Sequence, residues 1–263
     1  MLTYENLVDY AKERGMPQEK TRGILREYLQ ILILKILFSD RNSNTFSFTG
    51  GTYLRLANLT KRFSEDLDFY SVKLNMDAFQ VSINRIAGEL QKYNIKTKLD
   101  FDKRENLFTA GIHFTDIEEA YGLSGSRRGV IVIKFETAVP EWKINNSQRV
   151  INGYGETFIA NCLDESILMA DKIDAIHKKP RGRHIYDIIY LLSKKTEPDK
   201  KVLKGYGYKE VWCEVLLKRF NEFTDSELKK FADQLGPFLF DEDEKNKIID
   251  AKKIVSALVS QNS

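Results

Sequence analysis

Residues 46–72 read FSFTGGTYLRLANLTKRFSEDLDFYSV. The first four residues alternate apolar and polar side chains, which is the period-2 pattern of a half-buried strand. Gly50 and Gly51 follow, where the chain can turn tightly and a phosphate can approach the backbone without meeting a Cβ atom. The leucines and alanine of residues 54–59 predict a short helix. The N–H groups at the start of that helix would face an anion.

A pair of acidic residues stands at the head of the next apolar run. Asp66 and Asp68 are separated by Leu67, so in a strand both carboxylates lie on one face while Leu67 and Phe69 point into the core. Mg²⁺ is held in proteins by a few carboxylates together with phosphate oxygens of a substrate. The stretch therefore predicts a magnesium site beside a phosphate-binding turn. The alternative is a surface hairpin with incidental acidic residues.

Length and composition are those of a soluble globular protein with one large or two modest domains. The chain has 263 residues, 42% of them hydrophobic and 30% charged, and a net charge of only +3. No apolar run is long enough to span a membrane, and the N-terminus has no signal-peptide pattern, so we expect a cytoplasmic protein. Cys162 and Cys213 lie far apart in the sequence and are expected to be reduced thiols. The three histidines lack metal-ligand spacing, which argues against a zinc hydrolase.

The first 155 residues mix helical and strand-like patterns, and the remainder is helical by pattern. This order predicts an α+β domain over residues 1–155, with a mixed sheet and helices on one face, followed by a helical bundle over residues 156–263. The helical patterns of the first domain cover two segments within residues 4–38 and one segment at 76–93. Its later strand-like segments are 95–101, 107–114 and 129–139, and a loop is expected over 115–128.

The last of these strands carries an acid in an otherwise apolar run. Lys134 and Glu136 share one face of the strand, while Phe135 lies on the other. An unpaired buried charge is costly, so Glu136 needs a partner. Two interpretations remain open. Either Lys134 neutralises Glu136 in an ion pair, or Glu136 is the third carboxylate of the predicted metal site.

The central stretch also resembles a known family. Gly50-Gly51-Thr52, followed after thirteen residues by Asp66-Leu67-Asp68, resembles the first motif of the polymerase-β-like nucleotidyltransferase superfamily. The fuller wording, GGTYLR followed by RFSEDLDF, is similar to the AbiEii/AbiGii toxin family of bacterial abortive-infection and type IV toxin–antitoxin systems. The resemblance implies the nucleotidyltransferase fold, with a mixed sheet and flanking helices, followed by a C-terminal helical bundle.

The resemblance assigns roles to residues in both halves of the chain. The segment Lys134-Phe135-Glu136 matches a Lys–apolar–Glu pattern of the family, and a helical lysine followed by an Arg-Asp-x-x-Asp-Leu segment is matched at residues 172–188. His184 stands where the family usually has Asp, which puts an Arg–Asp structural pair in doubt. The implied metal ligands are Asp66, Asp68 and Glu136. The implied catalytic residues are these three and Asp187, and the implied nucleotide-binding residues are Gly50, Gly51, Thr52, Lys172 and Arg183.

The function implied by the resemblance is transfer of a nucleoside monophosphate from an NTP to an acceptor, with Mg²⁺ or Mn²⁺ as cofactor. The expected acceptor is RNA, with a tRNA 3′ end as one form, and the expected consequence is growth arrest by a toxin. An antitoxin without stable contact to the toxin is the expected partner. Two alternatives remain: a nucleotide-binding module that has lost transfer activity, and an interaction protein of the same fold.

Overall fold

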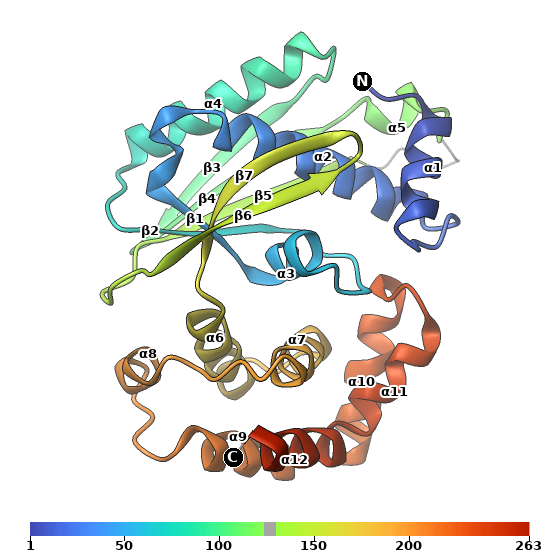
Figure 1. Ribbon diagram of the computed structural model, residues 1–263. Coiled ribbons are helices and arrows are strands. Elements are labelled where there is room, and N and C mark those ends of the chain that lie inside the picture. Colours follow the sequence, from blue (N-terminus) through green and yellow to red (C-terminus); the bar gives the residue numbers. More distant parts are fainter. Residues whose placement is uncertain (124–129, 263) are drawn as a thin grey trace. The chain divides into compact units, whose positions relative to one another are not determined.

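The protein is described from a computed structural model that covers residues 1–123 and 130–262 (Figure 1). The chain divides into two compact units. The sheet unit comprises residues 1–59 and 63–162, and the helical unit comprises residues 60–62 and 163–263. The expected loop at 115–128 includes residues 124–129, which lie outside the described part. Within the described part, no helix is both long enough and apolar enough to cross a membrane.

The sheet unit contains one mixed sheet of seven strands in the order β3-β4-β5-β2-β1-β7-β6. β1 runs antiparallel to β2 and parallel to β7, and β2 runs parallel to β5. This confirms the predicted α+β class with a mixed sheet. The strands are β1 (Phe46–Thr49), β2 (Leu67–Ser71), β3 (Lys98–Arg104), β4 (Leu107–Phe114), β5 (Ile131–Ala138), β6 (Asn146–Gly153) and β7 (Glu156–Leu163).

Aromatic side chains fill the packed face of this sheet. Phe69 of β2 stacks on Phe135 of β5 with ring centroids 4.3 Å apart, and Phe79 lies 6.0 Å from Phe135. Phe79 belongs to α4, which packs with α2 over this side of the sheet (Figure 1). Because side chains alternate along a strand, Asp68 and Glu136 lie on the opposite, open face. The helices of the unit are α1 (Tyr4–Glu13), α2 (Thr21–Phe38), α3 (Gly50–Asn58), α4 (Met76–Lys92) and α5 (Ile117–Ala120).

The arginine of the GGTYLR segment belongs to the core. Arg55 on α3 donates from Nε to Oε2 of Glu27 on α2 at 2.7 Å, and both side chains are only 2% exposed. A buried ion pair of this kind is strongly destabilising when one partner is removed. Arg55 therefore holds α3 against α2, and its position in the motif reflects packing.

The helical unit is a bundle, as predicted. Its core is formed by apolar side chains of α6, α7, α9, α10 and α12, and α7 packs against α6, α10 and α12. The described helices are α6 (Glu165–Lys178), α7 (Gly182–Ser193), α8 (Lys200–Gly205), α9 (Trp212–Glu222), α10 (Asp225–Leu235), α11 (Asn246–Ile249) and α12 (Ala251–Asn262).

The sheet extends further along the chain than the sequence pattern indicates. The expected boundary near residue 155 placed residues 156–163 in the helical domain, but they form strand β7, which pairs with β1 through Phe48 and Cys162. The sheet unit accordingly ends at residue 162. Strand β6 was also not predicted. Only Ile151 and Gly153 are buried along it, so the periodic apolar signal of a strand is weak there.

Candidate active site

The predicted carboxylates gather on the open face of the sheet. Asp68 pairs with Thr49 of β1 on one side and with Glu136 of β5 on the other. Asp66 directly precedes β2, two residues before Asp68, so it is directed to the same face. The structure therefore brings these three acidic residues to adjacent positions around the end of β2.

Gly50 lies directly against the carboxylate of Asp68. A Cβ atom at Gly50 would stand 2.2 Å from Oδ2 of Asp68 and 2.9 Å from its Cβ, and the φ angle of Gly50 is +79°. Side chains rarely adopt this left-handed region, and no side chain fits in the remaining space. The glycine is therefore required both by the backbone conformation and by the position of Asp68.

We expect Gly50→Ala to displace the Asp68 carboxylate and to lower the free energy of unfolding by at least about 1–2 kcal/mol, the cost of a left-handed non-glycine residue. The matched control is Gly88→Ala on α4, where a Cβ atom would meet nothing within 4 Å. That change should raise the free energy of unfolding by about 0.5–1 kcal/mol. Urea unfolding of both variants measures the difference. Equal effects of the two changes would contradict the close approach of Gly50 and Asp68.

The start of α3 has no cap from its own N-cap side chain. Thr49, the N-cap residue, makes no side-chain capping bond, and the first turn of α3 contains no acidic residue. The N–H groups of a helix start attract phosphates when no side chain occupies them. Thr52 has a different role, because its buried Oγ1 donates to the carbonyl oxygen of Asp66 at 2.5 Å. Its hydroxyl thus ties α3 to the residue that precedes β2.

The ammonium group of Lys134 lies among the carboxylates. Its Nζ is 2.6 Å from Oε1 of Glu136, so the ion pair considered in the sequence is present. The hydrogen bond to Glu136 raises the pKa of Lys134, and the negative charges of Asp66 and Asp68 act in the same direction. All three carboxylates therefore act on one cation. The positive charge of Lys134 thus lies in the region where the predicted metal ion would bind.

The donor set fits Mg²⁺ bound jointly by protein and substrate. Among the described residues, no three His, Cys, Asp or Glu side chains form a closed metal cage. Mg²⁺ commonly uses one or two carboxylates and takes its other ligands from substrate phosphates and water. Asp66 and Asp68 supply two carboxylates with hard oxygen donors. Because Gly50 has no Cβ atom, the carboxylate of Asp68 has space beside it.

The helical unit holds a second charged group, centred on Asp187 of α7. Arg62 donates from Nε and Nη2 to the two carboxylate oxygens of Asp187, each at 2.8 Å, and Lys172 of α6 lies 2.7 Å from Oδ2. Asp187 is 0% exposed. Burial alone would raise the pKa of Asp187, but the charges of Arg62 and Lys172 outweigh it and hold the pKa below its usual range. Both oxygens of Asp187 are thus engaged by cations.

His184 precedes Asp187 by one helical turn and is neutral. Burial, with the nearby charges of Lys172 and Arg183, lowers the pKa of His184 to about 3. Its Nδ1 has no hydrogen-bond partner among the described residues. A neutral imidazole therefore stands where the family usually has an acid. Arg183 is half-buried on the same helix, and the structural ion pair of Asp187 is made with Arg62.

We expect acid to destabilise the protein through His184. Its pKa is about 3 when folded and about 6.5 when unfolded, so the unfolded chain binds a proton first as the pH falls. The stabilising contribution is complete above about pH 6.5 and is lost as the pH falls toward 3. Between pH 6.5 and 4.5, His184→Gln should lose about 2 kcal/mol less of its free energy of unfolding than the wild type. Urea unfolding at both pH values tests this, and identical losses would contradict it.

Arg62 was missed as a functional candidate by the sequence interpretation. It lies within RFSEDLDF, four residues before Asp66, yet it belongs to the helical unit and is 2% exposed. Its partner Asp187 is 125 residues away in the sequence. The only available signal was an arginine next to the acidic motif. Within the helical unit, the ion pairs of Asp187 join residues 60–62 to helices α6 and α7.

A mixed sheet with acidic residues beside a glycine-initiated helix, followed by a helical bundle, defines a nucleotidyltransferase fold. Solved structures agree. The fold is similar to MenT4, a nucleotidyltransferase toxin from Mycobacterium tuberculosis H37Rv, with a TM-score of 0.60 at 15% identity over 97% of this chain and 90% of that one. It is also similar to JHP933 from Helicobacter pylori, with a TM-score of 0.52 at 15% identity over 91% and 93% of the two chains.

The family model of the nucleotidyl transferase AbiEii toxin, from type IV toxin–antitoxin systems, matches residues 33–252. The match covers most of the chain, and the protein therefore belongs to this family. A comparison with curated proteins gave no match. Family membership confirms the resemblance seen in the sequence and supports nucleotidyltransferase activity in a toxin.

Proposed function

We propose that this protein is a metal-dependent nucleotidyltransferase toxin that moves a nucleoside monophosphate from an NTP to an RNA acceptor. The observation that carries the proposal is the position of Asp68, which lies where a side chain of Gly50 would stand and opposite Glu136 in the sheet. Family membership supports the reaction class. The nucleotide, the acceptor and the metal are the proposed parts.

Each group of the sheet unit has a defined task in this proposal. Asp66 and Asp68 would hold Mg²⁺ or Mn²⁺. When bound, the divalent cation would act as a Lewis acid for the negative charge that develops in an in-line displacement. The N–H groups of Gly50, Gly51 and Thr52 at the start of α3 bind the β- and γ-phosphates.

The chemical step joins the acceptor to the α-phosphorus. A hydroxyl oxygen of the RNA forms a bond to the α-phosphorus, and the bond from that phosphorus to the bridging oxygen breaks. Pyrophosphate leaves with the electron pair, and Glu136 accepts the hydroxyl proton. In the helical unit, Lys172 and Arg183 are the proposed nucleotide-binding residues, and their positive charges suit phosphate oxygens. Asp187 is fully buried and is a positioning residue that holds Lys172.

The partners follow from the same proposal. The acceptor is an RNA, with the 3′ end of a tRNA as the form to test first. The family is described as part of type IV toxin–antitoxin systems, which supports an antitoxin that opposes the toxin's effect. We propose that this antitoxin acts without stable contact to the toxin.

The proposal is tested by incubating the purified protein with Mg²⁺ or Mn²⁺, total tRNA and each labelled NTP in turn. Label should appear on RNA with at least one NTP. If nucleotide binds but no RNA is labelled with any NTP, the protein is a nucleotide-binding module without transfer activity. If nucleotide does not bind either, the site described here is wrong.

A further inference from the structure

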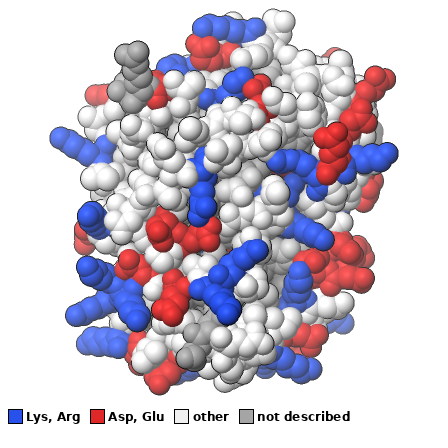
Figure 2. Space-filling model, in the orientation of Figure 1, with Lys and Arg blue, Asp and Glu red and all other residues white. Residues whose placement is uncertain are grey.

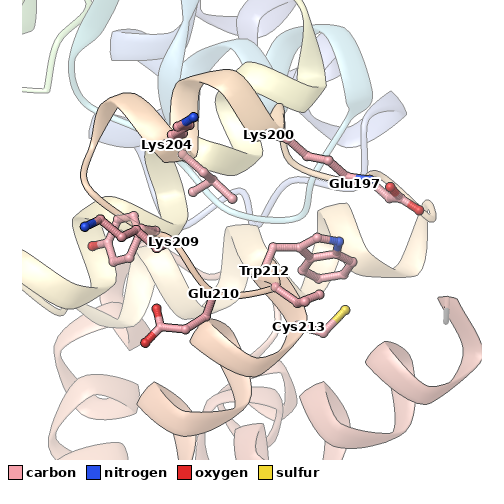
Figure 3. A pocket seen from close by; sticks show the side chains of 10 residues that line it. Glu197, Lys200, Lys204, Lys209, Glu210, Trp212 and Cys213 are labelled. Atoms are coloured by element: carbon pink, nitrogen blue, oxygen red, sulfur yellow. The ribbon is translucent and has the colours of Figure 1, made fainter.

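A cavity of about 660 Å³ opens in the helical unit, between α8, the loop that follows it and α9 (Figure 3). Trp212, the first residue of α9, lies at the centre of its lining and is 7% exposed. Leu203 of α8 and Val211 add apolar surface, and Tyr208 adds a second aromatic ring. The cavity therefore has an aromatic and apolar floor of the kind on which a planar ring packs.

Three lysines stand around this floor. Lys200 and Lys204 are four residues apart on α8, so they lie on the same side of that helix, and Lys209 comes from the following loop. Within residues 1–123 and 130–262, no acidic side chain forms an ion pair with any of the three. Lys178, in contrast, is paired with Asp174. The cavity is thus lined by three lysines and two glutamates, and none of the three lysines is held in a close ion pair by a described residue.

The surrounding chain is the most basic part of the helical unit. Residues 178–209 contain ten Lys and Arg against three acidic residues, whereas residues 221–250 contain four basic and nine acidic residues. Figure 2 shows Lys and Arg side chains gathered over α8 and the loop after it, at the lower left of the view. A local excess of this size attracts a polyanion even though the whole chain has a net charge of only +3.

We propose that this cavity binds one nucleotide of single-stranded RNA. The cavity would then be a subsite for the RNA acceptor, and this inference rests on the proposed function. The base packs against Trp212, and Lys200, Lys204 and Lys209 hold the phosphates on either side. Glu197 and Glu210 also line the cavity. Their carboxylates can accept hydrogen bonds from base N–H groups such as N3–H of uracil, whereas an acidic peptide would bring only further negative charge to them.

Tryptophan fluorescence reports directly on this cavity. The chain has two tryptophans, and Trp142→Phe leaves Trp212 as the only one. Trp142 lies in the sheet unit, where its ring contacts Tyr70, and phenylalanine keeps an aromatic ring at that position. We expect single-stranded hexauridylate to quench the fluorescence of this protein in a saturable way. UMP and hexaglutamate at the same concentrations should quench it weakly.

Charge reversal identifies the phosphate contacts. In the Trp142→Phe background, the double change Lys200→Glu and Lys204→Glu should weaken hexauridylate binding about tenfold or more. It should also reduce the slope of log Kd against log salt by about 1.4, the value for two lost single-strand phosphate contacts. The matched control is the double change Lys229→Glu and Lys230→Glu on α10, which reverses two exposed lysines away from the cavity. It should change the affinity less than about twofold.

Three results would overturn the inference: no quenching by hexauridylate, equal binding of UMP and hexauridylate, or equal effects of the two double changes. Stronger quenching by hexaglutamate would instead indicate an acidic protein partner. The transfer assay separates this inference from the proposed function. Transfer without quenching leaves the function in place and removes the subsite, whereas quenching without transfer to any RNA leaves an RNA-binding protein without the proposed activity.

Discussion

Asp68→Asn is expected to abolish transfer of nucleotide to RNA while the protein remains folded. Asparagine has the shape of aspartate, so it fits beside Gly50, where an added Cβ atom would stand 2.2 Å from Oδ2 of Asp68. The neutral amide no longer supplies the negative charge that the proposed metal ion requires. Loss of a single group that stabilises transition-state charge costs about 10²–10³-fold in rate, and we expect at least that reduction.

The sheet offers a matched control for this change. Asp100 of β3 also lies on the sheet surface and also approaches a glycine, because a Cβ atom at Gly111 would stand 2.5 Å from its Oδ2. It pairs with His113 and has no role in the proposed site. Asp100→Asn should change the transfer rate less than about twofold, in contrast to the large loss expected on removing transition-state charge stabilisation. Similar rates for the two variants, with both shown to be folded by thermal unfolding, would remove Asp68 from the catalytic site.

The second large effect is expected for Asp187→Asn, which should lower the free energy of unfolding by about 3–5 kcal/mol. The change leaves Arg62 and Lys172 as two buried cations without their shared carboxylate. Because domains are stable by only about 5–15 kcal/mol, this is a large fraction of the total. Urea unfolding measures it. Asp250→Asn is the control, since it breaks an exposed pair with Lys253 and should cost less than about 1 kcal/mol.

A double variant tests the reason for this loss. Lys172→Met alone leaves Asp187 paired with Arg62, so it should cost less stability than Asp187→Asn while it still reduces transfer. Added to Asp187→Asn, Lys172→Met removes one of the two unpaired cations and should restore part of the lost stability. Additive losses in the double variant would contradict the account of a shared buried carboxylate.

Transfer rates of the Asp187 and Lys172 variants distinguish a positioning role of Asp187 from a catalytic one. If Asp187 acts by holding Lys172, then both single variants should impair transfer and the double variant should be no slower than the slower of them. Independent catalytic roles would instead make the rate losses multiply. The comparison uses the transfer rate at saturating NTP, with each protein kept below its unfolding temperature.

The placement of Asp66 and Asp68 on one face of the sheet could be predicted from the sequence because its signals are local. Asp66, Leu67 and Asp68 lie within three residues, and strand alternation alone directs the two acids to one face. Gly50 was predicted to be a turn residue. The structure adds why glycine is needed there, because the carboxylate of Asp68 fills the space that a side chain at position 50 would occupy. Lys134 and Glu136 share a strand face, so their ion pair was also open to prediction.

The parts that could not be predicted depend on contacts between distant residues. Arg55 lies in the motif, but its partner Glu27 is 28 residues earlier, and nothing in the local pattern distinguishes a buried arginine from an exposed one. Arg62 and Asp187 are separated by 125 residues, so the engagement of both Asp187 oxygens appears only after folding. Strand β6 was missed because it has few buried apolar residues at the sheet edge, which periodicity cannot detect.

The most direct test of the central claim compares two labels on the same NTP. With wild-type protein, Mg²⁺ and total tRNA, an NTP labelled at the α-phosphate should transfer its label to RNA, and the same NTP labelled at the γ-phosphate should not. The γ-label should instead appear in released pyrophosphate, because the bond to the α-phosphorus is the one that forms. Label on RNA from the γ-phosphate alone would mean phosphoryl transfer, and it would contradict the nucleotidyltransferase mechanism assigned to Asp66 and Asp68.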